Sequence, residues 1–228
     1  MEANPTPKSL NWFEIWRMAF LRPTIQTFSR IINDSKASIR WGMLWSAITA
    51  LIIWAVGPQR SIWWGFVATH FGIDAASYFL IIGTIAFPVF GAITLLLNVA
   101  IAHALSRLFG GAGTFHQLVF SWGAIQLPFI LFSGLAFNIL PYIYSMFRLL
   151  SSTEMNLPAL GIILLVSTLI AGAGILYLFY AQGVAFSAVE KFSVGKGFGI
   201  LFLFACILGI ASACLSFSFQ AIVSKFLL

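Results

Sequence analysis

Four side chains are the best candidates for chemistry in this sequence: His103, Arg107, His116 and Glu190. His103 and Arg107 are four residues apart, so on a helix they share one face. Two histidines and a carboxylate can bind a metal ion, but the spacing of His103, His116 and Glu190 matches no recognised ligand pattern. An isolated carboxylate in an apolar chain usually has a charged partner, so we expect a polar cluster in which Arg107 contacts Glu190. Charge reversal at both positions should then rescue either single reversal.

A glycine-rich turn directly follows Arg107 and contains Gly110, Gly111 and Gly113. Backbone N–H groups in such a turn can bind a phosphate. However, the turn lacks the Gly-x-x-x-x-Gly-Lys-Ser/Thr pattern of a phosphate-binding loop, and no strand precedes it. A helix C-cap followed by a tight hairpin turn explains the glycines more simply. The predicted polar cluster therefore comprises His103, Arg107, Gly110, Gly111, Gly113, His116 and Glu190.

The remaining reactive residues do not form a catalytic set. Cys206 and Cys214 are eight residues apart, which is about 12 Å along one helix, too far for a disulfide in a straight helix. We interpret both as small apolar packing residues. No nucleophile is spaced with a base, so we predict no catalytic residue, no cofactor, no metal and no enzymatic activity.

The elements that must position these side chains are long apolar segments. Hydrophobic residues make up 61% of the chain and charged residues 8%, against about 25% charged in a typical soluble domain. Five segments without Asp or Glu have the length of a membrane span, about 20 residues. They lack the period-two alternation of barrel strands and are therefore expected to be helices. The predicted spans are residues 41–57, 78–109, 117–141, 157–186 and 197–225.

These spans define an all-α, polytopic membrane protein with a bundle of five transmembrane helices. Residues 1–40 are expected to form a cytoplasmic interfacial segment and residues 41–228 the five-helix domain. Two spans exceed what a bilayer needs, since residues 78–109 would extend about 48 Å as a straight helix. Pro88 can bend the first of them, and both long spans are expected to extend into the cytoplasm with His103, Arg107 and Glu190 near their ends.

The distribution of basic residues predicts the orientation. Nine of the twelve Lys and Arg residues lie before the first span or in the second and fourth connections. The positive-inside bias then puts the N-terminus in the cytoplasm and the C-terminus outside. Residues 61–73 are apolar and aromatic but too short to cross, so they are expected at the outer surface. A re-entrant or sixth crossing segment is the alternative.

The N-terminal segment has the pattern of two interfacial amphipathic helices. Trp12, Phe13, Trp16 and Phe20 recur at helical spacing in the first. Pro23 suits the start of the second, on which Ile25, Phe28, Ile31 and Ile32 form an apolar stripe. The segment either anchors the protein at the membrane or senses or deforms the bilayer. Basic residues around it are predicted to contact anionic headgroups: Arg17, Arg22, Arg30, Lys36 and Arg40.

Several short patterns resemble one family. They are Arg22-Pro23-x4-Phe28-x2-Ile31, the run from Leu108 to Gln117, which reads Leu-Phe-Gly-Gly-Ala-Gly-Thr-Phe-x-Gln, and Gly123-x4-Pro128. Together with the five spans they resemble the Yip family, the Ypt-interacting-protein domain membrane proteins, and in particular its short prokaryotic members. The resemblance covers the chain from about Arg22 to the C-terminus. It implies a five-helix membrane domain with a cytoplasmic N-terminus and an external C-terminus.

Eukaryotic Yip relatives act in vesicle trafficking and associate with small GTPases and with one another. This chain lacks their Asp-Leu-x-Gly-Pro motif, so small-GTPase binding is not carried over. We expect a non-enzymatic protein of a prokaryotic cytoplasmic membrane that binds lipids, other membrane proteins or further copies of itself, and no nucleic acid. The alternative is a transporter or channel for a small solute, with Asn98, Gln126 and Gln182 along the path. No ionisable residue lies in the predicted membrane interior, which argues against a proton-coupled carrier.

Overall fold

The structure is a computed structural model that describes residues 9–56, 65, 67–131 and 157–227. Within helices it describes no side chains at residues 56, 157–161, 163, 164, 212, 213 and 215–227. Every regular element in the described ranges is a helix, as the composition predicts. The helices are α1 (Trp12–Leu21), α2 (Ile25–Ile32), α3 (Ile39–Val56), α5 (Ile73–Leu108), α6 (Phe115–Phe129), α8 (Leu157–Glu190) and α9 (Val194–Leu227).

Three of these helices contain segments long and apolar enough to cross a membrane: Ile73–Leu108, Leu165–Glu190 and Val194–Ala211. A shorter apolar helix covers Ile39–Ala55. The chain is thus helical and of membrane-protein character, while the five-span bundle stays an expectation. Residues 61–64 and 66 of the segment 61–73, and residues 132–141 of the third predicted span, lie outside the described residues.

The third predicted span begins as α6, which is the most buried of the long elements. Residues 118 to 127 are all buried except Gln126, which is half-buried. Helices α3, α5, α8 and α1 pack around α6. Its sequence is no more apolar than those of α3, α5 and α8, but its side chains contact protein, because those helices and α1 pack around it.

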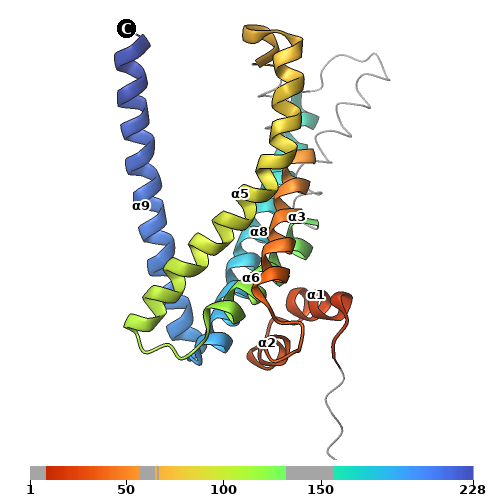
Figure 1. Cartoon of the computed structure of the whole chain (residues 1–228), viewed down its shortest axis with the longest axis vertical. Coiled ribbons are helices and arrows are strands. Elements are labelled where there is room, and N and C mark those ends of the chain that lie inside the picture. The colour runs from red at the N-terminus through yellow and green to blue at the C-terminus, as the bar shows by residue number, and fades with distance from the viewer. Residues whose placement is uncertain (1–8, 57–64, 66, 132–156, 228) are drawn as a thin grey trace, which may run out of the picture.

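Figure 1 shows how the helices are arranged. Helices α3 and α8 run along the long axis, and α1 lies across them near the lower end of the view. The α5–α6 and α8–α9 connections reach that same end, and α9 leads away from it to the C-terminus at the opposite end. We call the lower part, residues 9–41, 103–117 and 187–200, the basic end, because it holds eight of the described Lys and Arg residues.

Helix α5 is 36 residues long and contains Pro88. It changes direction about half way along (Figure 1), in line with the predicted bend, since a proline removes one helical hydrogen bond and crowds the preceding turn. Glycines on both sides of Pro88 hold α5 close to α3. A Cβ on Gly83 would lie 2.3 Å from the Trp54 ring and one on Gly91 2.4 Å from the Ala50 Cβ.

The two N-terminal helices form as predicted, but much of their apolar surface packs on protein. Ile15 and Ala19 of α1, and Phe28 and Ile31 of α2, are fully buried against α6 and α8. The apolar stripe of α2 is therefore not a lipid-facing surface. An amphipathic pattern indicates an apolar environment without saying whether lipid or protein supplies it.

Aromatic rings join α1 to the start of α3. The Trp12 ring centroid lies 4.3 Å from that of Trp41 and 5.4 Å from that of Trp45, and Trp16 lies 5.9 Å from Trp45. Trp45 in turn packs 5.0 Å from Phe120 of α6. Tryptophans gather at the interface depth of membrane proteins, so this group is consistent with α1 lying at that depth.

Lys36 does not have the surroundings of a headgroup contact. Its ammonium group donates to the Leu10 carbonyl and lies 5.0 Å from the centre of the Trp12 ring. Asp34 completes this clasp, because its carboxylate accepts the Leu10 N–H at 2.7 Å. The clasp ties the start of α1 to the α2–α3 connection, and the prediction that Lys36 faces anionic lipid is corrected accordingly.

Candidate functional site

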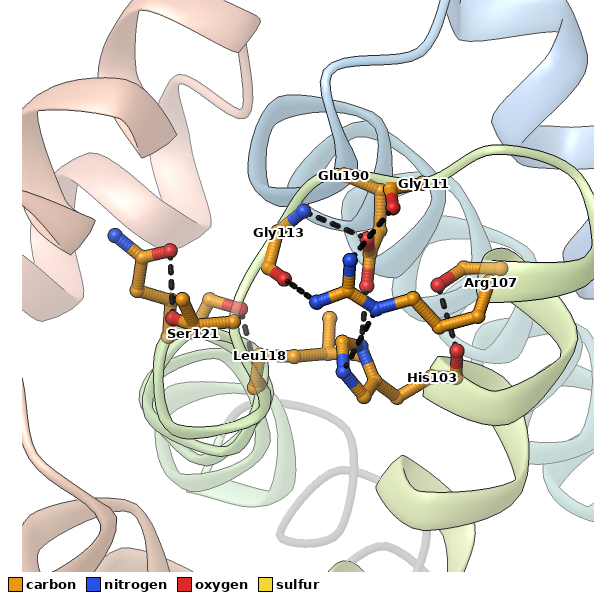
Figure 2. A network of polar contacts seen from close by, with 10 residues as sticks. His103, Arg107, Gly111, Gly113, Leu118, Ser121 and Glu190 are labelled. Carbon is orange, nitrogen blue, oxygen red and sulfur yellow. Dashed lines mark hydrogen bonds and ion pairs between the residues drawn. The ribbon is translucent and has the colours of Figure 1, made fainter.

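The candidate site is a polar cluster at the basic end, where the last turns of α5 meet the last residue of α8 (Figure 2). Helix α5 supplies His103 and Arg107, and α8 supplies Glu190. The α5–α6 connection, with Gly111 and Gly113, closes over them. Residues more than seventy positions apart in the sequence thus come together, as the sequence analysis expected for these five.

Glu190 is the centre of the cluster. It is 1% exposed, and its carboxylate has two partners. Oε1 lies 2.7 Å from His103 Nδ1, and Oε2 accepts the Gly113 N–H at 2.9 Å. The Glu190 backbone carbonyl accepts the Ala112 N–H at 3.2 Å. A buried carboxylate is tolerated only with such partners, so the end of α8 is tied to the α5–α6 turn through both side chain and backbone.

Arg107 binds the turn instead of the carboxylate. Its Nη1 donates to the Gly111 carbonyl at 2.9 Å and its Nη2 to the Gly113 carbonyl at 2.6 Å. Its Nε lies 3.4 Å from His103 Nε2. The expected contact between Arg107 and Glu190 is therefore wrong, because among the described residues the side chain that contacts the Glu190 carboxylate is that of His103.

These contacts define the hydrogen-bonding roles of His103. If Nε2 accepts from Arg107, then Nδ1 carries the proton and donates it to Glu190. The ring is then the neutral tautomer with its proton on Nδ1, and it connects a guanidinium on one side to a carboxylate on the other. His103 is therefore the positioning link between the two charged groups.

The glycines permit the close approach of the turn to α8. Gly110 has φ +80° and ends α5, and the Gly111 N–H donates to the Ser106 carbonyl at 2.8 Å. This is the predicted C-cap, in its six-to-one form. A Cβ on Gly111 would lie 2.6 Å from Glu190 Oε2, and one on Gly113 would lie 2.5 Å from the Val189 carbonyl oxygen.

The hydrogen bonds of the α5–α6 turn bear on whether its glycine N–H groups could bind a phosphate. The N–H of Gly110 donates to the Arg107 carbonyl, that of Gly111 to Ser106, and that of Gly113 to Glu190. All three glycine N–H groups are thus engaged within the protein. The turn in this arrangement presents no glycine N–H group to a phosphate.

A second turn, at the end of α8, packs against the first. Lys191 has φ +59°, which is unusual for a residue with a Cβ, and the Phe192 N–H donates to the Ser187 carbonyl at 3.0 Å. Lys196 then reaches back, with its ammonium group 2.7 Å from the Phe109 carbonyl and over the Phe192 ring. Lys196 is one of the basic residues of the fourth connection, which the charge distribution predicts to be cytoplasmic. The sequence assigns it no partner, since no local spacing links it to Phe109.

His116 does not join the cluster. It is exposed on the first turn of α6, and no hydrogen bond links it to His103 or Glu190 in the described part of the chain. Within the described ranges no group of three His, Cys, Asp or Glu residues could hold a metal ion. The polar groups of the cluster are bonded to one another and to the α5–α6 turn.

The predicted headgroup residues separate into two kinds. Lys36 is held in the clasp with Leu10, whereas the arginines are exposed and none makes a side-chain hydrogen bond or ion pair within the described residues. The exposed residues are Arg17, Arg22, Arg30 and Arg40.

No protein-family model matches the chain, and no curated protein or solved structure is significantly similar to it.

Proposed function

We propose that the chain is a non-enzymatic integral membrane protein of the Yip type that binds membrane lipids or other membrane proteins through its basic end. The observation that carries the proposal is the exposure of Arg17, Arg22, Arg30 and Arg40 around a helix that lies across the bundle. Basic residues at such a position attract anionic groups at a membrane surface, each contributing about 1 kcal/mol.

The polar cluster helps to hold together the part of the protein that carries the exposed arginines. Arg107, Glu190 and Lys196 join the α5–α6 turn to the α8–α9 turn, and both turns lie at the basic end. These turns border α6 and α8, on which α1 and α2 pack. Holding the turns therefore helps to hold the arginines of α1 and α2 in a fixed arrangement, which lowers the entropy that binding must overcome.

The orientation belongs to the proposal as well. The basic end faces the cytoplasm of a prokaryotic cell, the apolar helices cross the cytoplasmic membrane five times, and the C-terminus lies outside. The agreement between the positive-inside bias and the common location of α1, α2 and the two turns supports this topology. Reporter fusions at the two termini should then report opposite sides.

The test is purification of the full chain in a mild detergent, with identification of the retained lipids and proteins. A variant with Gln at positions 17, 22, 30 and 40 should lose most of the retained lipid or partner. The matched variant with Lys at the same positions keeps the charge and should retain most of it. The proposal fails if the wild-type chain retains neither lipid nor protein and instead conducts a solute across liposomes.

A further inference from the structure

One face of α1 is exposed while the opposite face is buried. Phe13, Arg17 and Leu21 follow one another at four-residue intervals on the outer face, and Phe13 and Leu21 are 68% and 66% exposed. Ile15 and Ala19 on the inner face are fully buried. A cation between two large exposed apolar side chains suits the boundary between acyl chains and phosphates.

The position of this face is set by contacts within the protein. Asn11 caps α1 in a reciprocal capping box with Glu14, the Trp12 ring packs on Trp41, and the Tyr177 hydroxyl donates to the Phe20 carbonyl. Both ends of α1 are therefore held. Its outer face does not need to be ordered by a ligand, because the bundle already orients it.

At the basic end the negative charges are bonded within the protein, whereas several positive charges are exposed. Its three described carboxylates accept bonds from the protein itself: Glu14 from the Asn11 N–H, Asp34 from the Leu10 N–H, and Glu190 from the Gly113 N–H. Arg17 and Arg22 have no such partner within the described residues. These two guanidinium groups are free to bind an external anion, and guanidinium suits the oxygen atoms of a phosphate.

We propose that Phe13, Arg17, Leu21 and Arg22 form a binding site for the headgroup of an anionic phospholipid. Arg17 and Arg22 bind the phosphate and the anionic headgroup, while Phe13 and Leu21 enter the acyl region beside it. This inference rests on the proposed function and narrows it to one ligand class and to the outer face of α1 with the residue that follows that helix.

The test uses the full chain in detergent with equal amounts of phosphatidylglycerol and phosphatidylcholine, and native mass spectrometry to count retained lipids. The wild-type chain should retain phosphatidylglycerol in preference. Arg17→Gln should lower that retention about fivefold, and Arg17→Gln with Arg22→Gln at least tenfold, without changing phosphatidylcholine retention. Phe13→Ser with Leu21→Ser should lower the retention of both lipids.

Lys191→Gln is the matched control, since it also removes one exposed cation from the basic end, but from the α8–α9 turn and not from α1. It should change phosphatidylglycerol retention by less than twofold, and an unchanged melting temperature checks that each variant is folded. Equal losses in Arg17→Gln and Lys191→Gln would overturn the site in favour of diffuse charge. Displacement of the lipid by inorganic phosphate at the same concentration would overturn the lipid assignment.

The outcomes also separate the two proposals. Equal retention of both lipids overturns the preference for an anionic headgroup but leaves lipid binding itself intact. Retention of neither lipid, by the wild-type chain, overturns both the site and the lipid-binding form of the proposed function.

Discussion

His103 Nδ1 and Glu190 Oε1 lie 2.7 Å apart although the two residues are 87 positions apart in the chain. The pair joins the last turns of α5 to the end of α8. His103 also accepts from Arg107, whose guanidinium binds the α5–α6 turn, and Glu190 accepts the Gly113 N–H of that turn. Because Glu190 is buried, removing any one member leaves a polar group without its partner.

Glu190→Ala should lower the stability of the protein by about 2 to 4 kcal/mol, because the Gly113 N–H and His103 Nδ1 lose their acceptor. Glu190→Gln keeps the shape and one carbonyl oxygen, so it should cost less than the alanine variant. The measurement is the melting temperature of the purified full chain in detergent. His116→Ala removes an exposed histidine nearby and serves as the control. A melting temperature for Glu190→Ala equal to that of His116→Ala would contradict the buried pair.

The partner of Glu190 decides the result of a charge-reversal experiment. Sequence reasoning predicts that Arg107→Glu combined with Glu190→Arg restores an ion pair. In the structure Arg107 donates to the carbonyls of Gly111 and Gly113, and a glutamate cannot donate to either. We therefore expect the double reversal to melt no higher than Glu190→Arg alone. Recovery to near the wild-type melting temperature would instead show a direct contact between positions 107 and 190.

The cluster shows which parts of a site can be read from a sequence. Its membership was largely predictable, since His103 and Arg107 share a helix face and ionisable residues are rare in this chain. The pairing was not predictable. Whether His103 or Arg107 lies level with Glu190 depends on how far α5 is shifted along α8, because the two residues share one face and differ by about one turn. The hydropathy pattern of two nearly uniformly apolar helices does not define that shift.

Some features of the fold were likewise predictable from the sequence and others were not. Long apolar segments and the C-cap at Gly110 follow from length, composition and glycine chemistry. The burial of the apolar stripe of α2 in the protein does not follow, because Phe28 and Ile31 would suit lipid as well as α8. The location of α6 at the centre also needs tertiary contacts, which no local pattern encodes.

Gly111→Ala should destabilise the α5–α6 turn by about 1 to 3 kcal/mol, since the added Cβ would lie 2.6 Å from Glu190 Oε2 and 2.9 Å from Ser106 Oγ. Gly199→Ala is the control, because nothing lies within 4 Å of the position on α9 where the Cβ would be added. It should leave the melting temperature unchanged or raise it. Melting curves of the two variants in the same detergent make the comparison, and an unchanged curve for Gly111→Ala would argue against the tight turn.

Gly42 and Gly123 lie where the backbones of α3 and α6 approach closely. A Cβ on Gly123 would lie 2.5 Å from the Gly42 carbonyl oxygen, and one on Gly42 would lie 2.5 Å from the Val119 carbonyl oxygen. Backbone atoms cannot yield as a flexible side chain can, so Gly123→Leu should force the two helices apart. Overpacking of this kind typically lowers the free energy of unfolding by about 1 to 3 kcal/mol. We expect the melting temperature to fall by about 5 °C or more.

Gly172→Leu provides the matched comparison, because Gly172 is also a helical glycine but is exposed, with nothing within 4 Å of its added Cβ. The same substitution there should leave the melting temperature close to that of the wild-type chain. If the two leucine variants melt alike, α3 and α6 are not in backbone contact. If only Gly123→Leu melts early, the contact is required, and α6 is held against α3 by the approach of Gly123 to Gly42.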